Sequence, residues 1–168
     1  MISLPDSNIR ILEPVSELSF FDTQSIEVAR EISPLEAWNI IMSQPQPLLR
    51  LAFQVRDTVS SCFGVRKIGG FSGRQTQQVV SGDTLDFLLV ELDFLLVENV
   101  DTQTLVLPER DRHLDVMTCI STGEHSVAVT SSVRVHNLFG TLYMIPVGIA
   151  HKWIVRGMLK HLRQTLAA

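Results

Sequence analysis

The sequence has few of the residues that build metal sites, disulfide frameworks or common catalytic motifs. Its two cysteines, Cys62 and Cys119, make neither a framework nor a zinc-ligand spacing, so we expect two free thiols in a reducing compartment. The five histidines also lack metal-ligand spacing, and we expect no metal and no other cofactor. The chain contains no G-x-x-x-x-G-K-[ST], no H-E-x-x-H and no G-x-S-x-G, the signatures of phosphate-binding loops, zinc proteases and α/β-hydrolases.

Positive charge is also scarce. The net charge is -4, which argues against a nucleic-acid surface, and we interpret the basic residues near the C-terminus as a solvated helix end. The first residues, MISLPDSNIR, contain no basic segment followed by an apolar one, so they do not predict a secretory signal. We therefore expect a cytoplasmic protein that does not bind nucleic acid.

Apolar residues, by contrast, are plentiful. They make up 45% of the 168 residues, against 19% for charged residues, which is typical of a globular chain with a substantial core. We predict one domain over residues 1–168, in which residues 1–15 form an irregular N-terminal arm that contains Pro5 and Pro14.

Residues 137–166 have the clearest pattern and predict one long helix. Asn137 is a good N-cap, because its side-chain oxygen can accept from an amide of the first turn. Gly140, Gly148 and Gly157 would let the helix backbone approach a sheet closely, and Pro146 predicts a kink or the true helix start. Two adjoining apolar rows predict a broad buried face, with Leu142, Ile145, Ile149 and Trp153 in one row and Val147, Ile154, Met158 and Leu162 in the other.

The same helix could be read as a membrane segment, but its charges argue otherwise. The uncharged run over residues 137–150 is shorter than the roughly 20 residues that a membrane span needs. Cations that suit the C-terminal end of a helix dipole follow it, namely Lys152, Arg156, Lys160, His161 and Arg163. We favour a buried or half-buried helix over one that lies on a membrane surface.

The chain before this helix changes from helix to strand patterns. Residues 16–28 predict a strand, and Ser33, Pro34 and Glu36 form a capping box at the start of a short helix. A second short helix is predicted over residues 48–62. Beyond residue 65, apolar segments separated by turns predict several strands, at residues 84–100, 104–108, 110–121 and 124–136.

An exact repeat lies inside the strand region. The heptad Leu-Asp-Phe-Leu-Leu-Val-Glu occupies residues 85–91 and again residues 92–98. Because seven is odd and strands alternate with period two, we expect a bulge, a bend or an excluded copy there. We favour a local duplication over a role in function.

One predicted hairpin carries the candidate chemistry. With a two-residue loop at Thr122-Gly123, Asp115 would face Thr130 and His113 would face Ser132. One side of the hairpin would then be polar, with Glu109, Asp111, His113, Asp115, Thr130, Ser132, Arg134 and His136. The other side would be largely apolar, with Leu114, Val116, Thr118, Ile120, Val127, Val129, Val133 and Val135.

The polar side has two interpretations. His113 with Asp115 or Asp111 could act as an acid–base pair, since histidine titrates near neutral pH and a carboxylate can orient it. Alternatively, as we favour, this side faces solvent and forms weak cross-strand ion pairs. Arg110 and Arg112 fall on the apolar side by strict alternation, where an arginine at the rim could meet an anionic group.

Two stretches resemble a known family. One is Asp111-Arg112-His113-Leu114-Asp115, and the other runs from residue 133 through Gly140, Tyr143 and His151 to residue 155. Together they resemble a bacterial family of uncharacterised domains in the START-like superfamily (SRPBCC), which also contains polyketide cyclases and birch-pollen-allergen-like proteins. The order of strand, two short helices, antiparallel strands and long C-terminal helix is similar to the helix-grip order, although that family has one copy of the heptad. The resemblance implies a hollow between sheet and helix for an apolar small molecule, and it implies no known activity.

We therefore predict an α+β fold in which a curved antiparallel sheet grips the long C-terminal helix. The predicted function is non-catalytic binding of a hydrophobic or amphipathic small molecule between sheet and helix. The alternatives are a small cofactor-free cyclase or dehydratase that uses His113 with Asp115 or Asp111, and a membrane-surface or protein-interaction module. The predicted ligand-binding residues are Arg112, Leu114, Val116, Ile120, Val133, Val135, Tyr143 and Val147.

Overall fold

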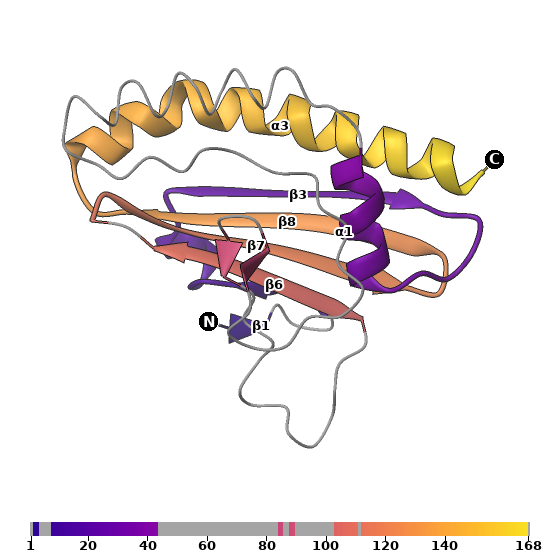
Figure 1. The fold of residues 1–168 in the computed structure, drawn as a ribbon. Helices are drawn as coiled ribbons and strands as arrows, with labels where there is room; N and C mark the ends of the chain where they lie inside the picture. Colours follow the sequence, from indigo (N-terminus) through magenta and orange to yellow (C-terminus); the bar gives the residue numbers. More distant parts are fainter. Residues whose placement is uncertain are drawn as a thin grey trace.

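The computed structural model describes residues 2–3, 8–43, 84–85, 88–89, 103–110 and 112–167. Four strands form an antiparallel sheet in the order β3 (Phe20–Glu27), β8 (Ser126–Val135), β7 (Leu114–Gly123) and β6 (Thr104–Arg110). The long helix α3 (Leu138–Leu166) crosses one face of this sheet, and α1 (Pro34–Ser43) stands beside its C-terminal half (Figure 1). The predicted α+β class, with an antiparallel sheet and a long C-terminal helix, is confirmed.

The start of α1 follows the capping pattern in the sequence. Ser33 precedes the first helical residue, Pro34, and its Oγ accepts from the amide of Glu36 at 3.1 Å. The Glu36 carboxylate does not complete the box in the predicted way, because it pairs with Arg30. The helix buries its apolar side against α3 and the sheet, through Pro34, Ala37, Trp38, Ile41 and Met42.

Helix α3 begins and ends where the sequence predicts, but the side that packs on the sheet is not the side predicted to be buried. It is capped by Asn137 and continues through Pro146 as one helix. Its buried residues are Gly140, Gly148, Val155, Leu159 and Leu162. The predicted buried row of Leu142, Ile145, Ile149 and Trp153 is wrong, because these side chains point outward and are 59–68% exposed. In the second predicted row, Leu162 is buried and Val147, Ile154 and Met158 are half-buried.

Small residues explain this rotation of the helix. A Cβ added to Gly148 would lie 3.0 Å from the Phe20 ring, and one added to Gly140 would lie 2.6 Å from the His113 carbonyl. Close approach to the sheet at these two positions turns the larger side chains of the first half of the helix away from it. Gly157 plays no such part, because nothing lies within 4 Å of the equivalent position there.

The β7–β8 hairpin has a different register from the predicted one. Its turn is Glu124-His125, since Gly123 still pairs with Ser126 and Thr122 with Val127. The β-branched Thr122 fits a strand better than a turn, and in the strand it is 6% exposed. Asp115 therefore faces Arg134, four residues beyond the predicted partner. A shift by an even number keeps each side chain on its predicted side of the hairpin.

The chain also reverses earlier than predicted on the β6 side. Strand β6 ends at Arg110, which pairs with Asp115 at the start of β7. Glu109 consequently belongs to β6 and pairs with Val116, so it does not join the predicted polar side. Arg110 likewise lies on the side of Asp115, contrary to strict alternation through a single strand.

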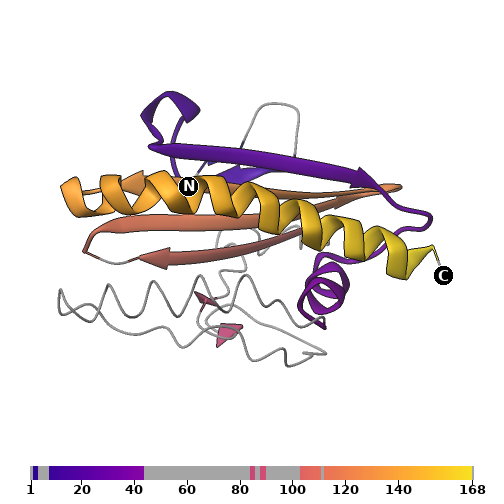
Figure 2. The same cartoon turned by 90° about the horizontal axis from the view of Figure 1, so that it is seen from above.

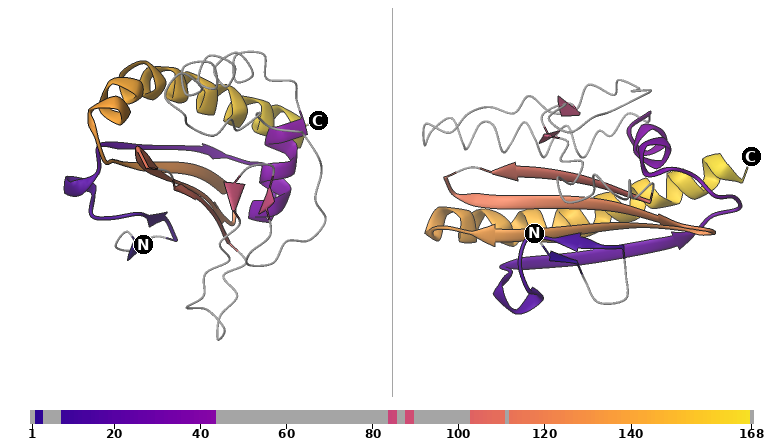
Figure 3. Two further views of the ribbon diagram at one scale, coloured as in Figure 1. Left: turned by 60° about the vertical axis from the view of Figure 1, so that its left-hand side comes forward. Right: turned by 90° about the horizontal axis from the view of Figure 1, so that it is seen from below.

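The N-terminal arm covers the second face of the sheet, which we had expected to face solvent. It contains β1 (Ile2–Ser3), β2 (Arg10–Ile11) and a short 3-10 helix, η1 (Val15–Glu17). Figure 3 shows the arm on the side of the sheet opposite α3. Its residues pack on the predicted polar side and bury a small apolar cluster, formed by Leu12, Leu18, Val106, Met117 and Cys119.

Several predictions fall outside the described residues. The second short helix, over residues 48–62, lies wholly outside them, and so does Asp111. The structure describes only part of the first heptad, in two short strands, β4 (Thr84–Leu85) and β5 (Leu88–Leu89). The second heptad lies outside the described residues. Leu85 pairs with Leu88 in antiparallel register, which agrees with a bend inside the first copy.

Candidate functional site

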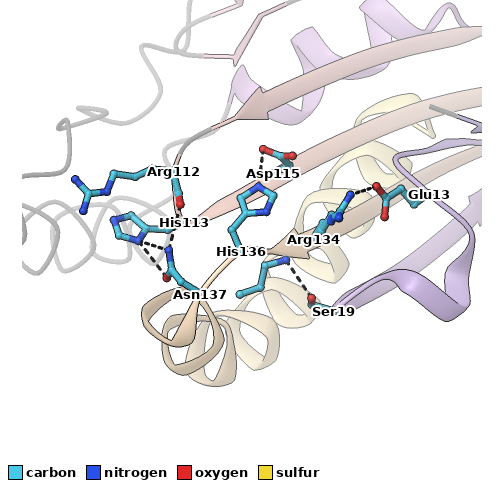
Figure 4. Close-up of polar contacts among 9 residues, drawn as sticks. Glu13, Ser19, Arg112, His113, Asp115, Arg134, His136 and Asn137 are labelled. Carbon is cyan, nitrogen blue, oxygen red and sulfur yellow. Dashed lines mark hydrogen bonds and ion pairs between the residues drawn. The ribbon is translucent and has the colours of Figure 1, made fainter.

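The candidate site lies where β7 begins and β8 leads into α3, and Asn137 connects its parts (Figure 4). The Oδ1 atom of Asn137 accepts from the amide of Gly140 at 3.1 Å. The Nδ2 atom donates to the Arg112 carbonyl at 3.1 Å and lies 2.9 Å from Nδ1 of His113. The first two bonds fix the orientation of the amide. Nδ1 of His113 then lies within reach of both amide atoms, since it is also 3.2 Å from Oδ1, and the imidazole tautomer sets which of the two it bonds. The cap was predicted from the sequence, and the contact with His113 was not.

His113 is turned toward α3 and is only 7% exposed. Its ring lies 4.7 Å from the ring of Phe139, which stacks at 6.4 Å with Tyr143. Its backbone carbonyl accepts from the amide of His136 at 2.8 Å. A side chain at Gly140 would clash with the same carbonyl. Glycine is therefore required for the first turn of α3 to pack this closely against His113.

Asp115 belongs to a different group of side chains. Its carboxylate lies 3.1 Å from Nε2 of His136, and both side chains are partly exposed. Beside them, Arg134 forms an ion pair with Glu13 of the N-terminal arm (Figure 4). The enzymatic hypothesis pairs His113 with Asp115 or Asp111. In the structure His113 bonds to Asn137 and Asp115 bonds to His136, and Asp111 lies outside the described residues.

Most predicted ligand-binding residues share the α3 side of the sheet. Val116 pairs with Val133 across β7 and β8, and Leu114 pairs with Val135. The Val135 side chain reaches the helix, because its Cγ1 would lie 2.9 Å from a Cβ at Gly140. Five of the predicted residues are half-buried on the sheet or on α3, namely Leu114, Val116, Val135, Tyr143 and Val147.

The three other predicted residues do not fit that description. Val133 is 3% exposed, so it is buried and not half-buried. Ile120 is 2% exposed and belongs to the main hydrophobic core with α1 and the C-terminal half of α3, away from the half-buried end. Arg112 is exposed. Only its backbone carbonyl takes part in the corner around Asn137.

A buried hydroxyl lies further along the same side of the sheet. Ser131 is 2% exposed, and its Oγ has no hydrogen-bond partner among the described residues. Its cross-strand neighbours are Asp22 on β3 and Thr118 on β7, so three polar side chains lie side by side across this face. An unpaired buried hydroxyl costs about 1–3 kcal/mol, which makes Ser131 an unusual residue for a core position.

His151 of α3 is a second polar residue at the interface of helix and sheet. Its ring meets Phe20 edge-on, with centroids 5.6 Å apart. Burial lowers the pKa of His151 below its ordinary value; the charge of Asp22 opposes this lowering and that of Lys152 adds to it. Asp22 also accepts from Nε2 of Gln24 at 2.8 Å. The sequence placed His151 at an interface or surface but predicted none of these contacts.

The described residues contain no group of three or more histidine, cysteine, aspartate or glutamate side chains that could hold a metal ion. The corner around Asn137 offers an imidazole and an aromatic pair, and the neighbouring sheet face offers apolar side chains and the Ser131 hydroxyl. Such a surface suits contact with an apolar molecule that carries a polar group.

The fold is that of an α+β protein with a four-stranded antiparallel sheet and a long C-terminal helix. Residues 15–158 match a family described as "Protein of unknown function (DUF2867)", and the chain belongs to that family. Neither the curated proteins nor the solved structures contain a match to the chain.

Proposed function

We propose that this protein binds a hydrophobic or amphipathic small molecule between the sheet and the N-terminal half of α3, in a helix-grip arrangement. The observation that carries the proposal is incomplete burial of apolar side chains at one end of the helix–sheet interface. There Leu114, Val116, Tyr143 and Val147 are half-buried. Apolar ligands bind where such side chains line a concave surface that the protein itself does not fill.

The other end of the same interface supports this proposal by contrast. Around α1, the sheet and the C-terminal half of α3 form a closed core in which Leu107, Val127, Leu159 and Leu162 are at most 2% exposed. The sequence is no less apolar at the half-buried end. The difference therefore lies in packing, since α3 approaches the sheet there through Gly140 and Gly148.

Two polar features favour an amphipathic ligand over a pure hydrocarbon. Ser131 carries a buried hydroxyl that can both donate and accept. At the other end, the His113 ring lies next to Phe139, which in turn stacks with Tyr143. A ligand with one uncharged polar group could bond to either of them while its apolar part covers Val116 and its neighbours.

The enzymatic alternative has weaker support. It requires His113 to face the interior, and His113 is buried against Phe139. It also requires a carboxylate beside that imidazole, and Asp115 is engaged by His136 instead. Asp111 lies outside the described residues. We therefore propose binding as the primary function.

Fluorescence titration with diphenylhexatriene, a hydrocarbon that brightens in apolar surroundings, tests the proposal. We expect a saturable signal with one site per chain for the purified protein. The double substitution Val116→Phe with Val147→Phe would fill the half-buried end from both sides, and we expect it to weaken binding about tenfold or more, or about 1.4 kcal/mol. Native mass spectrometry of protein purified from cells would then reveal any ligand that copurifies.

Two matched controls make the result specific. Val15→Phe adds the same bulk to an exposed position in η1 and should leave the titration unchanged. Leu142→Ser with Ile149→Ser removes exposed apolar side chains from the outer side of α3 and should also leave it unchanged. A signal that the outer double variant abolishes, or that the filling variant leaves intact, would contradict the proposal.

A further inference from the structure

The outer side of α3 carries a continuous exposed apolar stripe. Its members follow the three- and four-residue spacing of one helix face, and each is 59–73% exposed. They are Leu138, Leu142, Ile145, Ile149 and Trp153, which we call the outer stripe. Five large apolar side chains in one row are more than the scattered surface residues of an ordinary domain, and contiguous patches of this kind mark interaction surfaces.

The same helix face becomes basic beyond the outer stripe. Continuing the spacing from Trp153 leads to Arg156, Lys160 and Arg163, all exposed, which we call the basic end. The guanidinium of Arg156 lies 6.0 Å from the Trp153 ring, so the last apolar residue and the first basic one are in contact range. One face of α3 therefore combines an apolar half with a cationic half.

The charge of α3 differs in sign from that of the whole chain. The helix contains Lys152, Arg156, Lys160 and Arg163 and no aspartate or glutamate, whereas the chain as a whole has a net charge of -4. A partner for this face must accept apolar side chains and must also carry negative charge. The interfacial region of an anionic membrane has both properties, and tryptophan favours that depth.

We propose that the outer side of α3 docks on an anionic membrane surface, with the outer stripe inserted among the acyl chains and the basic end against the lipid headgroups. The helix lies on the membrane and remains on its sheet. By length and composition α3 could cross a membrane, but crossing would remove Val155, Leu159 and Leu162 from the core. Docking with the outer side leaves all three in place.

Charge also decides against a second copy of the chain as the occupant. Two outer faces packed in parallel would bring two basic ends together, and the faces contain no acidic side chain to compensate. Packed fully antiparallel, each apolar half would meet a cationic half. Neither arrangement gives the apolar half an apolar partner and the cationic half an anionic one, whereas an anionic bilayer provides both.

Flotation of the full-length protein with vesicles tests the inference. We expect the protein to float with phosphatidylcholine vesicles that contain about 30% phosphatidylglycerol and much less with phosphatidylcholine alone, because cations near an anionic surface gain about 1 kcal/mol each. Arg156→Gln with Lys160→Gln and Arg163→Gln should lower partitioning about a hundredfold. Leu142→Ser with Ile149→Ser should lower it about tenfold or more.

Matched controls use residues of the same type away from this face. Val15→Ser changes an exposed large apolar side chain outside α3, and Arg110→Gln removes an exposed cation from β6; both should float like the unchanged protein. Circular dichroism would establish that every variant is folded, as expected for exposed positions.

Three results would overturn the inference. The first is no flotation of the unchanged protein with anionic vesicles. The second is equal flotation of the unchanged protein and the outer-stripe variant. The third is a dimer in solution that the outer-stripe variant dissociates, without vesicle binding by either form. Since the diphenylhexatriene titration concerns the other side of α3, its outcome and this one are independent.

Discussion

The two halves of α3 meet the same sheet in different ways. The C-terminal half places Val155, Leu159 and Leu162 into a core that also contains residues of α1. Figure 2 shows α1 beside this half of α3. The N-terminal half approaches through Gly140 and Gly148, with half-buried side chains along its flank and an exposed stripe on its outer side. Stability is therefore concentrated in the C-terminal half of the helix, and the half-buried and exposed apolar side chains are concentrated in the N-terminal half.

The two halves of α3 should differ most in the free energy of unfolding that is lost when a large side chain is truncated. Leu159→Ala removes a side chain that is 2% exposed and should lower the free energy of unfolding by about 3 kcal/mol. Ile145→Ala removes one that is 61% exposed and should change it by about 0.5 kcal/mol or less. Urea unfolding followed by circular dichroism measures both, and equal losses would show that the outer stripe is covered in solution.

Addition of a single methyl group should distinguish the glycines of the two halves. Gly140→Ala forces a Cβ to within 2.6 Å of the His113 backbone and should cost about 2 kcal/mol. Gly157→Ala meets no atom within 4 Å and should stabilise the protein by about 1 kcal/mol through helix propensity. The two effects have opposite signs, so shifts in the urea midpoint in the same direction would contradict the close approach at Gly140.

Removal of the buried hydroxyl between the two halves should stabilise the empty protein. Ser131→Ala eliminates an Oγ without a hydrogen-bond partner among the described residues and should raise the free energy of unfolding by about 1 kcal/mol. Its neighbour supplies the control, since Oγ of Ser132 accepts from the amide of Leu12 at 3.1 Å. Ser132→Ala should cost about 1 kcal/mol, and a loss of stability in Ser131→Ala would mean that its hydroxyl is satisfied.

The smallest expected effect concerns pH. Burial lowers the pKa of His151 in the folded state, so the unfolded chain takes up the proton first as the pH falls. The stabilising contribution is complete above the unfolded pKa of about 6.5 and declines as the pH drops below it. His151→Gln should therefore flatten the pH dependence of the unfolding free energy between about pH 7 and 5.

Local signals predicted the elements well. The caps at Ser33 and Asn137 are short-range hydrogen bonds, written within three residues of sequence, and both are present. Alternation predicted which hairpin residues share a side, although the turn was placed two residues too early. These features depend on neighbours along the chain, which is why a single sequence contains them.

Contacts between distant segments determine the orientation of α3 and the side-chain partners at the candidate site, which the sequence did not predict. Helical spacing identifies rows of apolar residues on α3, but it does not tell which row packs on the sheet. The close approach at Gly140 and Gly148 determines which side of the helix does so. At the candidate site, the partners of His113 and Asp115 depend on where β6 turns into β7 and where β8 meets α3. Such partners arise from packing between distant segments, so local pattern could not supply them.

The N-terminal arm has a consequence for the chemistry of the one cysteine among the described residues. Backbone amides of the arm donate to side chains of the sheet, from Arg10 to Sγ of Cys119 at 3.3 Å and from Leu12 to Oγ of Ser132. With the arm in place, Cys119 is fully buried and inaccessible to thiol reagents. The rate at which Cys119 becomes alkylated therefore reports how often the arm lifts from the sheet, and a protease cut within residues 13–18 should accelerate it while the four strands remain paired.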